Sequence, residues 1–137
     1  MSEQFHTVDV NLGADGGSHN GKDRSYPIAI GKGLLTDRRL WAEVIGSRGV
    51  VLVTDEQVGP LYAERLLSAL PALDRLTHIT LPAGEQHKSM ASVQQILDAA
   101  LADRHERQSL FVALGGGVVG DMTGFAASIF LRGADFI

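Results

Sequence analysis

The chain has 137 residues, of which 45% are hydrophobic and 20% charged, with no cysteine and a formal net charge of −4. This composition is typical of one soluble domain, and the lack of cysteine excludes disulfides, iron–sulfur clusters, cysteine zinc sites and thiol catalysis. The mild negative charge argues against a nucleic-acid or membrane partner, and without a signal peptide or an apolar run of about 18 residues we expect a cytoplasmic protein.

The first predicted elements are two short strands. Residues 5–12 alternate partly between polar and apolar, and residues 26–30 form a second run bounded by glycines. Their connection has no helical pattern, so we expect a β-hairpin at a sheet edge. Residues 13–24 are rich in glycine and polar side chains and predict a flexible loop. This loop nearly fits a P-loop, but Asp23 stands where the magnesium-binding hydroxyl would be, so we interpret it as an insertion.

Three strands that alternate with helices follow. Residues 49–54, 78–81 and 110–114 are predicted strands, and the runs 49–54 and 110–114 are apolar enough to be buried on both faces. Helices are expected from Pro60, from the N-cap Ser89 and from Val118 to Phe130. The first two helical faces comprise Leu61, Leu66, Leu67 and Leu70, and then Met90, Val93, Ile96, Leu97, Ala100 and Leu101.

This order predicts an α/β fold, in which a parallel sheet with helical crossovers follows an N-terminal β-hairpin. We expect a Rossmann-like nucleotide-binding domain over residues 1–137. The chain ends inside what resembles another strand, and the expected domain is therefore incomplete.

The most informative segment is the glycine turn after residue 114. Gly115, Gly117 and Gly120 have G-x-G-x-x-G spacing between a strand and a helix. Glycines permit positive φ angles and close approach of a ligand, and the first helical N–H groups favour an anion. A tight turn without a ligand is the alternative. The loop does not follow the first βα unit, so an ordinary Rossmann site is not expected. Asp121 is expected in the first helical turn, where it would complement the helix dipole.

A second polar cluster, Gly84-Glu-Gln-His-Lys88, follows the strand at 78–81. Ligands of parallel sheets bind at the carboxyl ends of the strands, so this cluster, Asp55 and the glycine turn can share one ligand. Glu85 would accept hydrogen bonds from ribose hydroxyls and Lys88 would neutralise a phosphate, although either can be an ordinary loop residue. The histidines have no metal-ligand spacing, so we expect no metal site in this chain.

Several motifs together resemble the 3-dehydroquinate synthase family, from about Tyr26 to Ile137. They are Gly31-x-Gly-Leu-Leu, Val53-Thr-Asp-x-x-Val58, Pro82-x-Gly-Glu-Gln-x-Lys88, and Leu110 through Ser128 followed by Arg132-Gly133. The resemblance implies NAD as cofactor. It implies that the adenosine lies near Asp55 and Val58. It implies that the ribose and phosphate region lies near Gly84, Glu85, Gln86, His87 and Lys88. The pyrophosphate and nicotinamide side would be enclosed by Gly116, Gly117, Val118, Val119, Gly120 and Asp121.

The resemblance also implies an activity. The family converts 3-deoxy-D-arabino-heptulosonate 7-phosphate to 3-dehydroquinate and phosphate in the shikimate pathway of aromatic amino acid biosynthesis. It implies a homodimer, zinc or cobalt as the metal, and contact of Arg132 with the sugar phosphate substrate across the dimer interface. An ordinary surface arginine is the alternative for Arg132. The family's metal ligands come after Ile137, in an α-helical domain, so this chain alone is expected to be inactive.

Three positions depart from the family pattern. Asp55 replaces a commoner asparagine and could weaken binding of an anionic dinucleotide, whereas His87 for tyrosine and Ala83 for aspartate are tolerable. Three other functions stay open: another sugar-phosphate cyclase, a metal-dependent polyol dehydrogenase, and a non-catalytic nucleotide-binding remnant.

Overall fold

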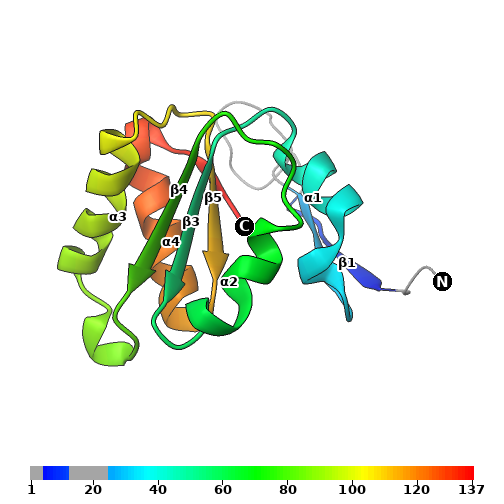
Figure 1. The fold of residues 1–137 in the computed structure, drawn as a ribbon, viewed down its shortest axis with the longest axis horizontal. Helices are drawn as coiled ribbons and strands as arrows, with labels where there is room; N and C mark the ends of the chain where they lie inside the picture. Colours follow the sequence, from blue (N-terminus) through cyan, green and yellow to red (C-terminus); the bar gives the residue numbers. More distant parts are fainter. Residues whose placement is uncertain (1–4, 13–24) are drawn as a thin grey trace. The chain divides into compact units, whose positions relative to one another are not determined.

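A computed structural model describes residues 5–12 and 25–137, which fall into two compact units, Met1–Asp37 and Arg38–Ile137 (Figure 1). The first unit holds β1 (His6–Val10), β2 (Tyr26–Ile30) and the 3-10 helix η1 (Leu34–Thr36). The two strands are antiparallel, which confirms the predicted hairpin. They pair only with each other in the part of the chain that the structure describes, so the predicted place at the edge of a larger sheet is wrong. The loop predicted at residues 13–24 lies outside the described residues.

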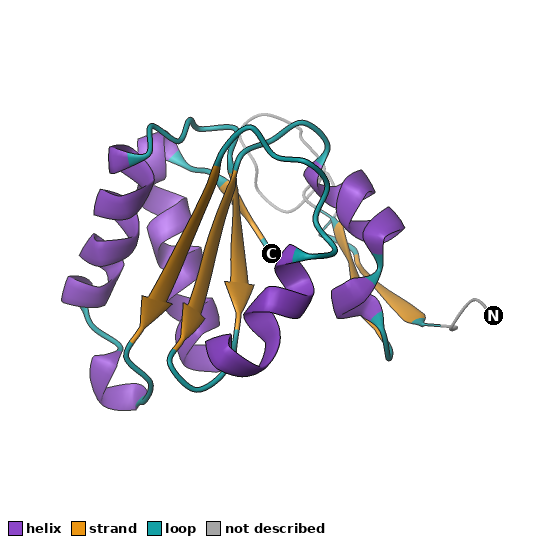
Figure 2. Cartoon of the chain, viewed as in Figure 1, coloured by secondary structure: helices purple, strands orange, loops and turns teal. Residues whose placement is uncertain are grey.

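The second unit contains a parallel sheet of order β4-β3-β5-β6, with helices between its strands (Figure 2). Its strands are β3 (Val50–Asp55), β4 (Leu76–Leu81), β5 (Leu110–Leu114) and β6 (Asp135–Phe136). Its helices are α1 (Arg38–Ile45), α2 (Gly59–Leu67), η2 (Glu85–His87), α3 (Met90–Ala102), α4 (Gly117–Ile129) and η3 (Phe130–Arg132). The predicted parallel sheet with helical crossovers is confirmed, including a strand at the end of the chain.

Strand β3 is the centre of the core, and every residue from Val50 to Thr54 is fully buried. Successive side chains of a strand point to opposite faces. Val51 and Val53 accordingly pack with Phe111 against α3 and α4, while the other face of β3 meets α2. Burial on both faces explains why this strand is a continuous apolar run rather than an alternating one.

The predicted helical faces are only partly correct. Val93, Ile96 and Ala100 of α3 are buried, but Met90 is 62% and Leu101 53% exposed. At about 100° per residue, these two lie some 60–80° to one side of the buried stripe. Leu61 of α2 is also exposed, because that helix buries Gly59, Ala63 and Leu66 instead. Among the described residues, no helix is long and apolar enough to cross a membrane.

Two fully buried threonines give a matched test of the core. The Thr54 hydroxyl donates to the Leu114 carbonyl at 2.7 Å, whereas the Thr123 hydroxyl has no hydrogen-bond partner within residues 5–12 and 25–137. We expect Thr54→Val to lower the free energy of unfolding by about 1–3 kcal/mol, because it removes this hydrogen bond to the partly buried Leu114 carbonyl. Thr123→Val should leave stability unchanged or raise it by about 1 kcal/mol. Urea unfolding measures both; a change of the same sign and size in the two variants would contradict this description.

Candidate functional site

The chain adds strands in opposite directions on the two sides of the β3–β5 pair: β4 follows β3 on one side, and β6 follows β5 on the other. Helix α2 leaves β3 on one face of the sheet, and α4 leaves β5 on the other (Figure 1). The hydrogen bond from Thr54 to Leu114 joins the carboxyl ends of these two strands. Ligands of open parallel sheets bind in the crevice outside such a reversal point. This edge of the sheet is therefore the candidate site.

The glycine turn follows β5 at this edge, and helix α4 begins at Gly117. No glycine of this turn has a positive φ angle, so that part of the prediction is wrong. Their small size matters instead. A Cβ on Gly115 would lie 2.7 Å from Val119 Cγ2, whereas a Cβ on Gly116, Gly117 or Gly120 would meet no atom within 4 Å. Gly115 is thus needed for packing, while the other three leave open space at the start of the helix.

The valines of this turn face inward. Val119 is 1% exposed and belongs to the core, and Val118 packs against that core. Neither side chain is free to bind a ligand. Their contribution to a site would be backbone N–H groups, because the first four N–H groups of a helix have no partner within it. Together with the helix dipole, these groups make the start of α4 suited to an anion.

The second predicted cluster forms the connection from β4 to α3. Gly84 has φ 113° and ψ 152°, a conformation open only to glycine, and a Cβ there would collide with the Gln86 amide. Residues Glu85–His87 then form η2. The predicted N-cap is confirmed, since the Ser89 hydroxyl accepts a hydrogen bond from Ser92 N at 3.3 Å. The His87 carbonyl accepts a second one from the Ser92 hydroxyl at 2.7 Å.

Lys88 joins this connection to α4. Its Nζ lies 2.7 Å from Asp121 Oδ2 and 3.7 Å from Glu85 Oε1. The hydrogen bond and charge of Asp121, followed by the charge of Glu85, raise the pKa of Lys88. Asp121 is the fifth residue of α4 and thus lies in its second turn, so its predicted place in the first turn is wrong. The helix begins one residue earlier than predicted, and the Asp121 carboxylate pairs with a lysine rather than with the helix end.

The connection after β3 completes the edge. Asp55 Oδ1 accepts hydrogen bonds from Gln57 N at 2.9 Å and Val58 N at 2.7 Å, and so orders the turn into α2. Glu56 Oε1 accepts one from Ala83 N at 3.4 Å. This bond links the connection after β3 to the connection after β4. Lys88 in turn links the connection after β4 to helix α4. The predicted residues Asp55 and Val58, Gly84 to Lys88, and Gly116 to Asp121 therefore lie on segments that these contacts link at one edge of the sheet.

A groove of about 420 Å³ adjoins the Lys88–Asp121 ion pair. It is lined by Lys88, Ser89, Met90, Val93, Asp121, Met122 and Phe125. Val93 and Met122 are apolar core residues, whereas Lys88 and Asp121 carry charges. A lining with both apolar and charged side chains suits a ligand with both kinds of surface. A larger groove, about 520 Å³ between α2 and β4, contains none of the predicted residues.

Arg132 does not lie at this edge. It follows the last turn of α4, and β6 then starts beside Leu110, the first residue of β5. Arg132 therefore lies at the amino edge of the sheet. The 13 residues of α4 span about 20 Å at 1.5 Å per residue. The structure thus separates Arg132 from the other predicted residues by the length of a helix.

A polar cluster that the sequence analysis missed is centred on His105, which is 3% exposed. Its Nε2 lies 2.9 Å from Thr77 Oγ1 and its Nδ1 2.9 Å from Ser109 Oγ. The Thr77 hydroxyl donates to Asp103, so Nε2 must donate to Thr77 and Nδ1 must accept from Ser109. Burial, followed by the charge of Arg75, lowers the pKa of His105. We interpret the cluster as structural, because it lies where β4 and β5 begin, away from the candidate site.

No group of three or more His, Cys, Asp or Glu side chains that could hold a metal ion occurs in the described parts of the chain. The site is thus built from backbone amides, one lysine and carboxylates.

Two solved structures illustrate which known proteins share this fold. A 2-deoxy-scyllo-inosose synthase in complex with carbaglucose-6-phosphate, NAD+ and Co2+ aligns with a TM-score of 0.71 and 22% identity, over 96% of this chain and 34% of that one. The 2-epi-5-epi-valiolone synthase of Streptomyces hygroscopicus, with NAD+ and Zn2+ bound, aligns with a TM-score of 0.64 and 30% identity, over 75% of this chain and 29% of that one.

Sequence comparison gives matches to 3-dehydroquinate synthases. Residues 78–137 match the family described as 3-dehydroquinate synthase N-terminal. The 3-dehydroquinate synthases of Pseudomonas putida and Teredinibacter turnerae are 51% and 47% identical to this chain, over 97% of it and 34% of each relative. The chain is thus similar to about the first third of these 3-dehydroquinate synthases. It spans about a third of the length of the curated relatives it matches.

Proposed function

We propose that this chain is the NAD-binding part of a 3-dehydroquinate synthase, an enzyme of the shikimate pathway. The reaction takes 3-deoxy-D-arabino-heptulosonate 7-phosphate to 3-dehydroquinate and phosphate. The observation that carries the proposal is the 2.7 Å Lys88–Asp121 ion pair, which joins the two motifs of the family resemblance at one sheet edge. We also propose a cytoplasmic homodimer, with zinc or cobalt held by residues outside the described ones.

The site fits a dinucleotide. The open space beside Gly116, Gly117 and Gly120 leaves room for a ligand backbone to approach α4, and the N–H groups there would hold the pyrophosphate. Glu85 and Lys88, with Gly84, Gln86 and His87 around them, would meet the ribose and phosphate region. Asp55 and Val58 would lie at the adenosine. Because Asp55 already accepts two backbone hydrogen bonds, its charge is partly satisfied before any nucleotide binds.

NAD, when bound, supplies the transient oxidation of one substrate hydroxyl to a ketone, which acidifies the adjacent C–H so that phosphate can leave. The residues of this chain orient the dinucleotide for that step. In the free protein Lys88 is held by Asp121, so its charge is positioned in advance at the edge where the phosphates would bind. Asp121, further along the same helix, would face the nicotinamide side.

We propose that Arg132 contacts the substrate bound to a second copy of the chain. Arg132 lies at the amino edge, whereas Lys88 pairs with Asp121 near the start of α4, so within one chain the two lie at opposite edges of the sheet rather than at one substrate. A homodimer in which Arg132 of one copy reaches the substrate of the other removes this conflict. This arrangement is the one that the family resemblance implies.

The test is an enzyme completed in the laboratory, in which residues 1–137 replace the corresponding third of the Pseudomonas putida relative. It should release phosphate from 3-deoxy-D-arabino-heptulosonate 7-phosphate without net NADH formation. Lys88→Ala should weaken NAD binding by about tenfold or more, since a charge-assisted contact is lost, whereas Arg65→Ala on exposed α2 should not. The isolated 137-residue chain should release no phosphate. Net NADH formation would favour a polyol dehydrogenase instead.

Another sugar-phosphate cyclase is the second candidate, since the solved structures of this fold are such enzymes. Identities of 47–51% to 3-dehydroquinate synthases, against 30% to the valiolone synthase, favour the first proposal. Activity of the completed enzyme depends on the borrowed substrate domain, so NAD affinity is the measurement that reports on this chain alone. If the chain binds no NAD in either form, a non-catalytic remnant becomes the better account.

A further inference from the structure

The turn after α4 has an unusual backbone. Leu131 has φ 44° and ψ 44°, Arg132 has φ 72° and Gly133 has φ 109°. Residues with side chains rarely adopt left-handed angles, because Cβ comes too close to the following carbonyl. Two of them in succession before a glycine persist only where the surrounding structure determines the conformation.

Both ends of the turn are fixed to the core. Phe130, which precedes it, is 2% exposed, and its ring centroid lies 5.2 Å from that of Phe111. Gly133 N donates to the Phe130 carbonyl and Ala134 N to the Ala127 carbonyl, both at 2.8 Å. The chain therefore has to return from α4 to β6 within a few residues, and a left-handed turn provides this sharp return.

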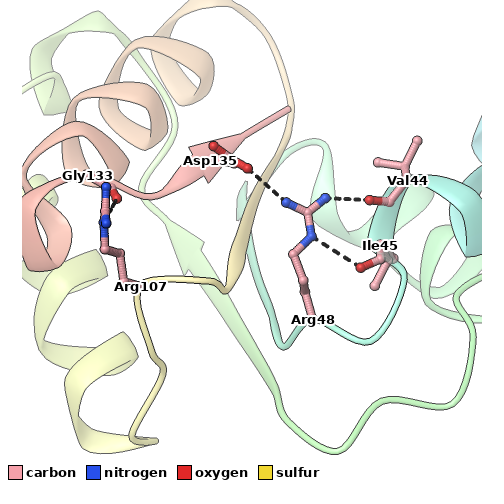
Figure 3. A network of polar contacts seen from close by, with 6 residues as sticks. All are labelled: Val44, Ile45, Arg48, Arg107, Gly133 and Asp135. Atoms are coloured by element: carbon pink, nitrogen blue, oxygen red, sulfur yellow. Dashed lines mark hydrogen bonds and ion pairs between the residues drawn. The ribbon is translucent and has the colours of Figure 1, made fainter. Parts of the chain in front are cut away.

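Two arginines hold the returning segment from other parts of the fold (Figure 3). Arg107, from the connection between α3 and β5, donates from Nε to the Gly133 carbonyl at 3.1 Å. Arg48, from the connection between α1 and β3, donates from Nη1 to Asp135 Oδ2 at 3.0 Å. Arg48 is itself fixed, because its other nitrogens donate to the Val44 and Ile45 carbonyls at the end of α1. We call Arg48 and Arg107 the arginine clamp.

The residue displayed by this turn is Arg132. Its side chain is exposed, and its guanidinium makes no hydrogen bond or ion pair with the described residues. Two arginines thus contact this segment, while a third, beside it, has no partner among residues 5–12 and 25–137. A free guanidinium on a fixed backbone is suited to the oxygens of a phosphate or carboxylate.

We propose that Arg48 and Arg107 are positioning residues for Arg132. The clamp holds the left-handed turn, and the turn sets the direction in which the Arg132 guanidinium meets an anionic group of the substrate. This inference rests on the proposed function for the identity of the ligand, but the effect of the clamp on the backbone does not depend on it.

The first test uses NMR of the 137-residue chain. In the wild type, Leu131 and Arg132 should show the strong intraresidue HN–Hα NOE that positive φ angles give. In the variant that combines Arg48→Ala with Arg107→Ala, both NOEs should fall to ordinary values, and the amides of Gly133 and Ala134 should exchange roughly tenfold faster. Arg104→Ala, in the same connection as Arg107, is the matched control and should change neither. Unchanged NOEs in the double variant would overturn the proposal, and Arg107→Ala alone serves if the double variant does not fold.

The second test uses the completed enzyme. The double variant should raise KM for the sugar phosphate roughly tenfold, with kcat and NAD affinity nearly unchanged, because the energy of one charged contact is lost. Adding Leu131→Gly should bring KM back toward the wild-type value, since glycine adopts the left-handed turn without the clamp. If the double variant is active and its KM for the sugar phosphate equals the wild-type value, the positioning role is refuted. An inactive wild type would count against the proposed function instead, while the NOEs still decide about the clamp.

Discussion

Gly117→Ala is expected to weaken NAD binding by roughly tenfold or more and to leave the fold as stable as before. An added Cβ at Gly117 meets no protein atom within 4 Å, so the folded chain accommodates it, and the lower entropy of the unfolded chain can add about 0.4–1 kcal/mol of stability. The same Cβ occupies the space beside the first N–H groups of α4, where the pyrophosphate would lie. Calorimetric titration with NAD and urea unfolding measure the two effects separately.

Gly115→Ala is the matched control, with the opposite expectation. Its Cβ would lie 2.7 Å from Val119 Cγ2 and 2.9 Å from Val119 Cβ. Because Val119 is a core residue, this overlap should lower the free energy of unfolding by about 1–3 kcal/mol. A Gly117→Ala chain that binds NAD normally would show that the ligand does not approach this helix start, and would contradict the proposed place of the pyrophosphate.

The stability of the chain should fall as the pH is lowered through about 6.5, with His105 as the main cause. Burial lowers the pKa of His105 in the folded chain, so below the ordinary histidine pKa the unfolded chain binds more protons than the folded one. The free energy of unfolding therefore increases as the pH rises through this window, and the contribution of His105 to stability decreases as the pH falls. Urea midpoints measured between pH 5 and pH 8 test this expectation.

His105→Gln should remove much of this pH dependence. The glutamine has no charge to gain, but the Ser109 hydroxyl loses its acceptor, so we expect a cost of about 1–3 kcal/mol at pH 8. His78→Gln is the control, because His78 is an exposed residue of β4 and its substitution should leave the pH profile as it is. A wild-type profile in His105→Gln would mean that other groups cause the acid sensitivity.

The sheet could be predicted well from the sequence, because strands that are buried on both faces are continuous apolar runs. The apolar runs of β3 and β5 and the N-cap Ser89 correspond closely to the observed elements. Helix α1 was not predicted, although Leu40, Trp41 and Val44 have helical spacing, because the helix is only eight residues long. Exposed Met90 and Leu101 show the limit of periodicity, which finds an apolar side of a helix but not how wide the buried stripe is.

The candidate site was predictable as a set of motifs but not as a geometry. Topology brings the connections after β3, β4 and β5 to one edge, and the order of the elements is readable from the sequence. The pairing of Lys88 with Asp121 could not be predicted from the sequence. It depends on the exact residue at which α4 begins, and the prediction was wrong by one residue. The roles of Gly115 and Gly117 differ for a similar reason: their spacing is the same pattern, and only the neighbouring side chains distinguish packing from open space.

Helix α4 has the glycine turn at one end and Arg132 just beyond the other, and this separation has a genetic consequence. If two copies share each reaction centre, one allele damaged at Lys88 and another damaged at Arg132 are defective in different halves of that centre. Subunits from the two alleles can then assemble into a mixed pair that keeps one intact centre. Two alleles damaged at the same end of α4 cannot repair each other in this way.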